Sequence, residues 1–268
     1  LCGAVRWLGL QGLAMIAPRA DRWHSSATPG MGGVGFVAAT LTACITMLLA
    51  TNAPPPRAFA LAVPAGAGAM FVIGILDDRF QLSPLAKLVS SLIVGALVVF
   101  MIASSMGRSL PWPATLVAVV WFGGVVHALN LLDNMDGLAG GVALVATALL
   151  AWLFAPAVGS FLVLYLVAVA GSLAGFLYWN VKPARLFMGD SGSLFLGGTL
   201  AAASLVAMIA PWADVSTSAA VVLLVLCVPL FDTGFVLVLR RLAGRKATRG
   251  GTDHVSHRLV SLGFSERS

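Results

Sequence analysis

Carboxylate and amide side chains are concentrated in one short stretch of the chain, between two long apolar runs. Asn130, Asp133 and Asp136 are spaced by three residues. His127 lies three residues before this set. If the stretch is helical, the four side chains share one face, because residues three and four apart are neighbours on a helix. A helical face with two carboxylates can bind a divalent cation, and ionisable groups beside apolar spans indicate a functional site.

Two adjacent acids, Asp77 and Asp78, end another apolar run. Neighbouring carboxylates repel each other and gain little unless a cation lies between them. The pair therefore favours metal or phosphate chemistry over an ordinary loop. Ser83 and Pro84 follow closely, and these residue types predict the N-cap and first residue of the next helix.

Asp190 lies in a Gly-Asp-Ser-Gly-Ser segment that begins a further apolar run. It can cap the helix that starts there. The backbone N–H groups of the same N-terminus can bind phosphate, and the two interpretations are compatible. Asp232 lies within the last apolar run, close to Pro229. A hydrogen-bonded structural role beside a proline kink and a catalytic role are both open for it.

The composition predicts an all-α polytopic membrane protein. Of the 268 residues, 59% are hydrophobic and only 10% are charged. Runs of about 18 or more apolar residues indicate membrane spans, and we expect about eight full transmembrane helices after a partial one within residues 1–16. The expected full spans are 32–50, 58–76, 85–103, 114–132, 137–155, 159–179, 191–210 and 217–240. Cys2, Cys44 and Cys227 have no paired spacing, so neither a disulfide framework nor a zinc site is indicated.

The basic residues predict the orientation of the spans, because cytoplasmic loops carry an excess of Lys and Arg. Alternate loops, counted from residues 17–31, hold most of them: Arg19, Arg22, Arg79, Lys87, Lys182, Arg185 and every basic residue from Arg240 onward. The opposite loops hold only Arg57 and Arg108. The acidic motifs and the histidines of the tail share the cytoplasmic side, with Asp214 as the exception. This one-sided distribution predicts a single cytoplasmic active site. The basic run from Arg240 favours attraction to anionic lipid.

Five motifs in order carry a resemblance to a known family. They are Thr28-Pro29 with Gly32-Gly33, Asp77-Asp78, the segment 130–139, the segment 180–193, and Asp253-His254 with His257-Arg258-Leu259. Together they resemble the polyprenyl-phosphate N-acetylhexosamine-1-phosphate transferases of glycosyltransferase family 4, which include the phospho-N-acetylmuramoyl-pentapeptide transferase. The resemblance runs from about residue 19 to the end of the chain.

The resemblance implies that a polyprenyl phosphate attacks the β-phosphoryl group of a UDP-sugar and releases UMP. Phosphoryl transfer depends on positioning and charge neutralisation, which favours Mg²⁺, with Mn²⁺ as the alternative. The implied metal ligands are Asp190 and Asp78. The implied catalytic residues are Asp77, Asp78, Asp133, Asp136, His254 and His257. The implied substrate-binding residues are Thr28, Asn130, Asn180, Lys182 and Arg258.

The tail distinguishes the branches of this family. Ser256 stands where the N-acetylglucosamine-type members usually have a third histidine, and the remainder of the tail is closer to that branch than to the muramoyl-pentapeptide branch. We therefore expect transfer of N-acetylglucosamine-1-phosphate, with the muramoyl-pentapeptide nucleotide as the alternative. The family usually continues after this motif, and the chain has no initiating Met, so we expect one transferase domain over 1–268 that is truncated at both ends. Residues 241–268 form its cytoplasmic basic and histidine segment.

A secondary transporter and an inactive family member are the alternatives of other classes. A transporter should have its polar residues at mid-span and related halves, whereas these acids lie at span ends and no internal repeat is visible. The expected partners are a UDP-sugar, a polyprenyl phosphate and the membrane, with no nucleic acid. The expected location is the bacterial cytoplasmic membrane, in a cell-envelope glycan pathway. A symmetric homodimer is expected only because such dimers are the most frequent oligomers.

Overall fold

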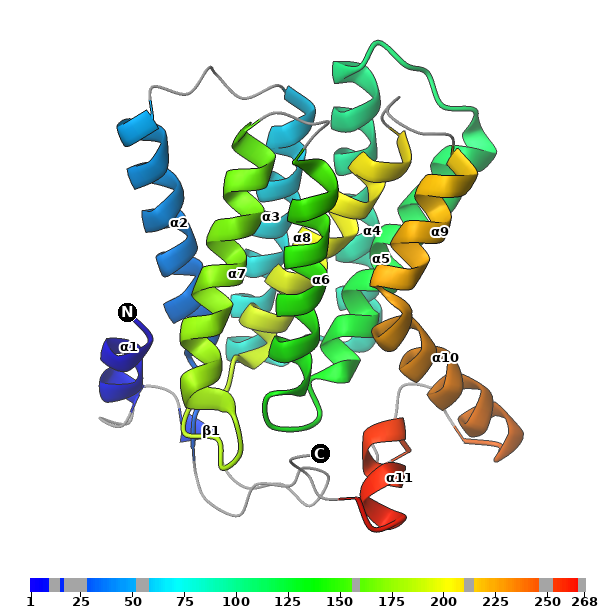
Figure 1. The fold of residues 1–268 in the computed structure, drawn as a ribbon. Helices are drawn as coiled ribbons and strands as arrows, with labels where there is room; N and C mark the ends of the chain where they lie inside the picture. The colour runs from blue at the N-terminus through cyan, green and yellow to red at the C-terminus, as the bar shows by residue number, and fades with distance from the viewer. Residues whose placement is uncertain are drawn as a thin grey trace.

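The protein is a bundle of long helices. The computed structural model describes residues 1–9, 15–16, 28–51, 58–155, 160–209, 215–245 and 253–264 (Figure 1). The helices are α1 Cys2–Leu8, α2 Gly32–Thr51, α3 Ala58–Phe80, α4 Pro84–Ser105, α5 Trp112–Leu132, α6 Leu138–Phe154, α7 Ser160–Asn180, α8 Gly189–Ile209, α9 Val215–Val225, α10 Cys227–Leu242 and α11 Val255–Ser261. In these ranges the only strands are β1 Met15–Ile16 and β2 Thr28–Pro29, which pair antiparallel. The predicted all-α class is confirmed.

The eight predicted spans all coincide with helices, although not all are single full-length spans. Six helices are long and apolar enough to cross a membrane. Helix α6 is apolar but shorter, and the last predicted span is broken into Ser216–Val225 and Cys227–Leu242, which meet at 76° (Figure 1). The break places Pro229 in the first turn of α10, where its missing N–H costs no helical hydrogen bond. The chain is a multi-span membrane protein.

Helix α8 forms the centre of the bundle, and 94% of its apolar window is buried. It is rich in Gly, Ala and Ser, and small residues allow membrane helices to approach closely. The closest approaches involve its first turn. A Cβ atom on Gly74 of α3 would lie 2.4 Å from the Cα of Ser191, and one on Gly33 of α2 would lie 2.5 Å from the backbone nitrogen of Gly192. These two glycines let α2 and α3 touch the start of α8.

We expect Gly74→Ala to destabilise the protein by about 1–3 kcal/mol, because the added methyl group overlaps backbone atoms that cannot move aside. The matched control is Gly68→Ala in the same helix, where an added Cβ meets nothing within 4 Å. That control should be neutral or stabilising, since Ala favours helix over Gly. Thermal unfolding in detergent, followed by circular dichroism, compares the two variants. Equal midpoints for both would contradict the close packing.

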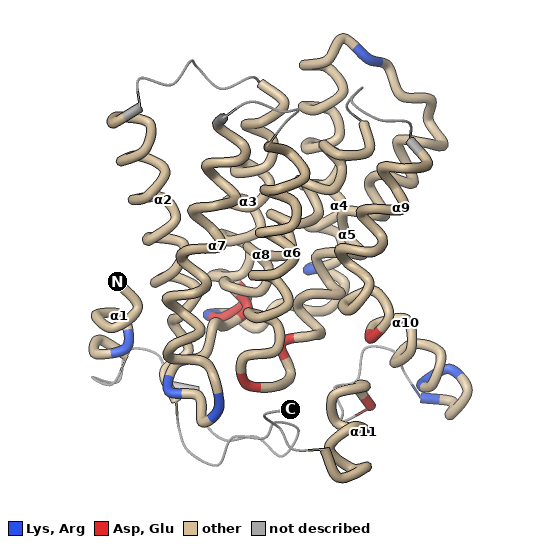
Figure 2. The backbone as a smooth tube through the Cα atoms, viewed as in Figure 1, with Lys and Arg blue, Asp and Glu red and all other residues tan. Residues whose placement is uncertain are grey.

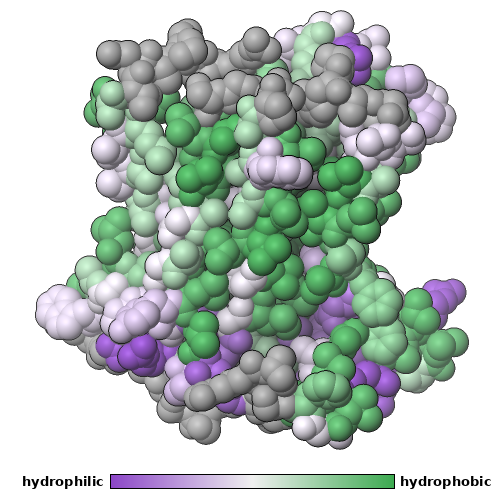
Figure 3. Space-filling model, viewed as in Figure 1, coloured by the Kyte–Doolittle hydropathy of each residue, from purple (hydrophilic) through white to green (hydrophobic). Residues whose placement is uncertain are grey.

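Charged side chains gather at one end of the bundle, where the α5–α6 loop, α10 and α11 lie (Figure 2). Apolar residues cover the flank between the two ends in the view of Figure 3. Arg108 is an exception at the opposite end, where its Nη1 donates to the carbonyl of Ile209 at 2.8 Å. Some residues on which the predicted orientation depends lie outside the described ranges. They are Arg19, Arg22, Arg57, Asp214, Lys246, Arg249 and Arg267. The described charges agree with the predicted one-sided distribution.

Candidate active site

Asp77 and Lys87 form an ion pair where α3 passes into α4. The Asp77 side chain is only 3% exposed, and its Oδ2 accepts a hydrogen bond from Lys87 Nζ at 2.7 Å. Its Oδ1 accepts from the backbone N–H of Leu82 at 2.8 Å. Ser83 caps α4 as predicted, because its hydroxyl accepts from the N–H of Ala86 at 3.2 Å. The cap sets the start of α4 at Pro84, and this start places Lys87 next to Asp77.

Asp78 faces a different partner from its neighbour. Its Oδ1 accepts from the backbone N–H of Asp190 at 2.8 Å, and its Oδ2 accepts from the N–H of Ser191 at 3.0 Å. A carboxylate at a helix N-terminus is stabilised by the unpaired N–H groups and by the helix dipole. Asp78 of α3 therefore caps α8. Asp190 lies inside the first turn of α8, so the prediction that it is the N-cap is wrong. The N–H groups of Asp190 and Ser191, which the sequence left open for phosphate, are taken by Asp78.

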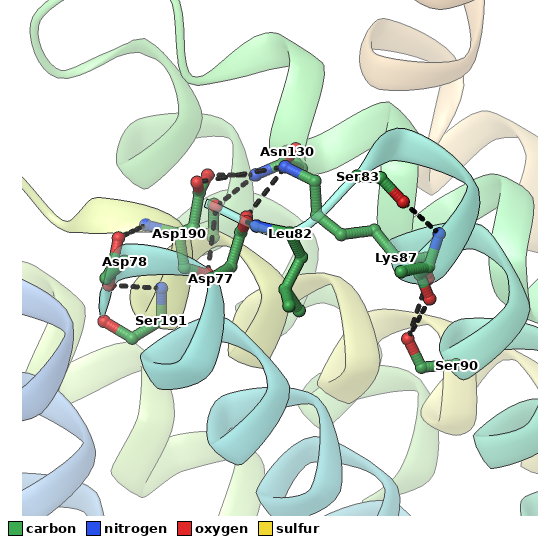
Figure 4. A network of polar contacts seen from close by, with 11 residues as sticks. Asp77, Asp78, Leu82, Ser83, Lys87, Ser90, Asn130, Asp190 and Ser191 are labelled. Atoms are coloured by element: carbon green, nitrogen blue, oxygen red, sulfur yellow. Dashed lines mark hydrogen bonds and ion pairs between the residues drawn. The ribbon is translucent and has the colours of Figure 1, made fainter. Parts of the chain in front are cut away.

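Asp190 completes a cluster with Asp77, Lys87 and Asn130 (Figure 4). Asn130 Nδ2 donates to Asp190 Oδ1 at 2.8 Å and to Ser193 Oγ at 2.8 Å. The other oxygen, Asp190 Oδ2, lies 4.0 Å from Lys87 Nζ, and the Asp190 side chain is 35% exposed. One ammonium group thus faces the carboxylates of both Asp77 and Asp190. In the sequence, Lys87 indicates only the topology, although it is the one charged residue within the 84–105 segment.

The donors in this cluster suit a magnesium ion that is partly held by substrate. Two carboxylates already face a cationic group, and Mg²⁺ commonly binds through one or two carboxylates together with substrate phosphates. Among the described residues, no group of three or more His, Cys, Asp or Glu side chains is arranged to hold a metal. The arrangement therefore fits a cation completed by phosphate oxygens better than one enclosed by protein ligands alone.

The interpretation of residues 127–136 as one helical face is wrong. Helix α5 ends at Leu132, and Asp133 and Asp136 lie in the turn that leads to α6. Gly137 precedes α6 with a φ of 76°, a left-handed conformation that an α-helix cannot contain and that glycine adopts readily. The three-residue spacing therefore spans a helix end, and the two aspartates do not share a face with Asn130.

His127 lies apart from the cluster, one turn before Asn130 and further from the C-terminal end of α5. Its Nε2 is 3.1 Å from Ser91 Oγ, a fully buried hydroxyl on α4. Asn130, one turn later, reaches Asp190 instead. Of the four residues expected on one face, Asn130 therefore joins this cluster through Asp190.

Two loops at the charged end are tied together by Asn180 and Asp136. Asn180 is 3% exposed, its Oδ1 accepts from the N–H of Gly137 at 3.0 Å, and its Nδ2 donates to the carbonyl of Leu186 at 2.9 Å. Asp136 Oδ2 accepts from the N–H of Ala184 at 2.9 Å. Both side chains join the α5–α6 loop to the segment between α7 and α8. Lys182 lies within that segment.

The motif at Thr28 packs against the residues that precede Asp190. The carbonyl of Pro29 accepts from the N–H of Phe187 at 2.8 Å, and the N–H groups of Gly32 and Gly33 donate to the carbonyls of Phe187 and Met188 at 2.8 and 2.9 Å. Thr28 itself is buried, with 4% exposed. Two motifs that are about 160 residues apart in the chain thus lie side by side.

The histidine segment is docked against α10. His254 Nδ1 is 2.6 Å from Asp232 Oδ2, and the rings of His254 and His257 have centroids 6.1 Å apart. Arg258 is exposed, and its guanidinium lies 5.3 Å from the ring centre of Phe235 on α10. Of the two roles open for Asp232, the structure shows the hydrogen-bonded one.

The basic run from Arg240 is expected to attract anionic lipid, but Arg240 itself is buried. It is 4% exposed, and its Nε donates to Asp253 Oδ2 at 3.2 Å. Arg245 Nη1 lies 3.4 Å from the other oxygen of Asp253, but its side chain is 64% exposed. The first arginine of the run is therefore part of the docking of the histidine segment.

His257 makes the stability of the protein pH-dependent. Burial lowers the pKa of His257 below its ordinary value of 6.5, its electrostatic interaction with the neighbouring His254 lowers it further, and the negative charge of Asp232 opposes this. As the pH falls below 6.5, the unfolded chain binds a proton that the folded state refuses, so stability falls. The contribution is fully present above that pH. We expect thermal midpoints measured from pH 8 to pH 5 to fall less steeply in His257→Gln than in the wild type. Asp232 and His254 are retained in both proteins, so parallel curves would contradict the assignment to His257.

Comparison with known proteins extends over nearly the whole chain. The family model described as glycosyl transferase family 4 matches residues 60–208. A probable undecaprenyl-phosphate N-acetylglucosaminyl 1-phosphate transferase of Bacillus subtilis (strain 168) is 32% identical over 95% of this chain and 72% of its own length. A decaprenyl-phosphate N-acetylglucosaminephosphotransferase of Mycolicibacterium smegmatis is 31% identical over 99% of this chain and 73% of its own length.

A phospho-N-acetylmuramoyl-pentapeptide-transferase of Lactobacillus johnsonii is also similar, with 31% identity over 94% of this chain and 82% of its own length. The region matched by the family model contains Asp77, Lys87, Asn130 and Asp190, the four side chains that meet at the charged end of the bundle. Because that match spans more than half of the chain and the relatives cover almost all of it, the protein belongs to glycosyl transferase family 4.

Proposed function

We propose that this protein transfers N-acetylglucosamine-1-phosphate from UDP-N-acetylglucosamine to undecaprenyl phosphate or a similar polyprenyl phosphate, with release of UMP. The observation that carries the proposal is the convergence of Asp77 and Asp190 on Lys87 at the charged end of a membrane bundle. A lipid phosphate at the membrane surface and a water-soluble nucleotide can meet only at such an end. The names of the Bacillus and Mycolicibacterium relatives support the same reaction.

The reaction forms one bond and breaks one. An oxygen of the lipid phosphate bonds to the β-phosphorus of the UDP-sugar, and the bond from that phosphorus to the bridging oxygen breaks, so that UMP leaves with the electron pair. Catalysis of this kind depends on alignment and on neutralising the phosphate charges. Mg²⁺, or Mn²⁺ in its place, would supply positive charge to the diphosphate. Asp190 would hold the ion, and Lys87 would add a second positive charge.

The two adjacent aspartates would have separate tasks. Asp77, paired with Lys87, is the candidate for deprotonating or orienting the lipid phosphate. Asp78, which the sequence also suggests as a metal ligand, would act mainly by fixing the backbone of Asp190, because both of its oxygens accept N–H groups of α8.

The remaining predicted residues would shape the substrate pocket. Asn130 orients Asp190, and Asn180 and Asp136 hold the two loops next to it. Asp133 and Lys182 in these loops, together with Thr28 of β2, are the candidates for nucleotide contacts. The candidates for contacts with the diphosphate or the sugar are His254, His257 and Arg258. The active site would face the cytoplasm of a bacterial cell, where nucleotide sugars are made. A homodimer stays a prediction.

The test is UMP release by the purified protein in detergent, with undecaprenyl phosphate and UDP-N-acetylglucosamine, with and without Mg²⁺. Release that requires both the lipid and the metal is expected. Release only from the muramoyl-pentapeptide nucleotide would instead support the second branch of the family, which the Lactobacillus relative represents. Absence of release from both nucleotides would refute the proposal and favour an inactive member or a transporter.

A further inference from the structure

A buried carboxylate on α10 holds the first residues of the histidine segment. Asp232 and His254 are each only 4% exposed. Asp232 Oδ2 lies 2.6 Å from His254 Nδ1, and Asp232 Oδ1 accepts from the backbone N–H of Val255 at 2.8 Å. The same carboxylate therefore fixes both the imidazole ring and the backbone at the start of α11.

The contact also determines which ring nitrogen carries the proton. An ionised carboxylate can only accept, so the hydrogen of the 2.6 Å contact belongs to His254 Nδ1. The nitrogen left to exchange a proton is Nε2, which accepts a proton in the neutral ring and donates to a phosphate oxygen only after it has taken one up. Carboxylate partners fix the tautomer and orientation of functional histidines in this way in metal sites and in hydrolases.

Among the described residues, Asp232 is the carboxylate that pairs with His254. Asp253, the preceding residue, is engaged by Arg240 Nε at 3.2 Å and by Arg245 Nη1 at 3.4 Å. The His257 ring lies 6.1 Å from that of His254. The charged and titratable groups facing this region are therefore Asp232 and Arg240 from α10, and Asp253, Arg245 and His257 from the segments on either side.

A second tether brings the segment to the candidate active site. Ser256 Oγ donates to Asn134 Oδ1 at 3.0 Å, which joins the start of α11 to the α5–α6 loop. That loop begins at Asp133, three residues after Asn130 in the last turn of α5, and Asn130 binds Asp190. Asp232 and Asn134 thus hold His254 and His257 from two sides, next to the loop that adjoins the cluster.

We infer that Asp232 is a positioning residue for the sugar-phosphate transfer, which holds His254 with a proton on Nδ1 and leaves Nε2 to take up a proton and donate it to a phosphate oxygen of the substrate. The inference rests on the proposed function. Asp232 itself touches no reacting atom and acts through the ring of His254. Two experiments test it, one of which does not depend on activity.

The first experiment is ¹⁵N NMR of the full chain in detergent micelles with ¹⁵N-labelled histidine. The His254 signals are assigned by their loss in His254→Gln. In the wild type we expect the proton on Nδ1. In Asp232→Asn, a side-chain amide can donate to Nδ1, so the proton should move to Nε2. Asp253→Asn is the matched control, since it removes the neighbouring carboxylate that binds arginines, and it should leave the tautomer unchanged. A proton on Nε2 in the wild type would overturn the inference.

The second experiment measures UMP release. Asp232→Asn should lower kcat by about 10- to 100-fold, as expected for loss of a group that orients a functional histidine, with the KM for the UDP-sugar near that of the wild type. Asp232→Glu should recover part of the loss, which a purely structural collapse of α11 would not allow. Turnover of Asp232→Asn equal to the wild type would refute the inference. If the wild type releases UMP from neither nucleotide, the proposed function fails, and the NMR result still decides whether Asp232 orients His254.

Discussion

Asp190→Asn is expected to reduce metal-dependent UMP release by at least about 10³-fold, at the upper end of what single electrostatic contacts contribute to catalysis. The fold should survive. The contacts that hold the start of α8 run through the backbone N–H of Asp190, and the substituted side chain can still accept from Asn130 Nδ2. The side chain is also 35% exposed, so its replacement buries no unpaired group. The loss would therefore report the missing negative charge.

The measurement is UMP release at saturating lipid and nucleotide over a range of Mg²⁺ concentrations. Asp253→Asn is the matched control, because it removes a carboxylate at the same end of the bundle that pairs with Arg240 and Arg245 and makes no recorded contact with the cluster. It should lose much less activity. Full Mg²⁺-dependent turnover by Asp190→Asn would remove Asp190 from the site.

Lys87→Met is expected to lower turnover by about 10²-fold while strengthening the binding of divalent cations to the substrate-free protein. Lys87 Nζ lies 2.7 Å from Asp77 Oδ2 and 4.0 Å from Asp190 Oδ2, so the ammonium stands where a cation would neutralise both carboxylates. Without it, two like charges face each other and a metal ion relieves their repulsion. Binding and turnover should therefore change in opposite directions.

Binding of Mn²⁺ to the detergent-solubilised protein, measured by electron paramagnetic resonance of the free ion, gives the first quantity, and UMP release gives the second. Arg79→Met is the matched control, because Arg79 follows Asp78 directly, is exposed and removes the same charge. It should change neither quantity much. Lys87→Arg should recover only part of the activity, since a guanidinium differs from an ammonium in shape and hydration. Weaker Mn²⁺ binding in Lys87→Met would show that the lysine does not compete with a cation.

The sequence predicts the helices well, because a membrane span needs a long apolar run that is easily recognised. The cap at Ser83 is also foreseeable. The different partners of Asp77 and Asp78 are not, since two identical neighbours are distinguished only by the distant groups that they meet. The helix end at Leu132 is missed because a spacing of three fits both a helix and the turn that follows it.

Two further features depend on contacts between distant parts of the chain. Lys87 gains its role from Asp190, and Asp232 gains its role from His254, which is 22 residues away. In each case the sequence supplies a charged residue near a span end, which equally fits topology or capping. The partner identifies the role, and the partner is set by the packing of α3, α8 and α10.

The central position of α8 has a consequence for biogenesis. A ribosome delivers helices in chain order, so α2 to α7 reach the membrane before the helix that they enclose, 94% of whose apolar window is buried. The bond from Asp78 to the N–H of Asp190 joins residues 112 positions apart, and it can form only after that late arrival. The early helices must therefore leave room among themselves, and the cluster of Asp77, Lys87, Asn130 and Asp190 cannot assemble until α8 has inserted. Ribosome stalling before residue 190 would leave a membrane-integrated chain that lacks this cluster.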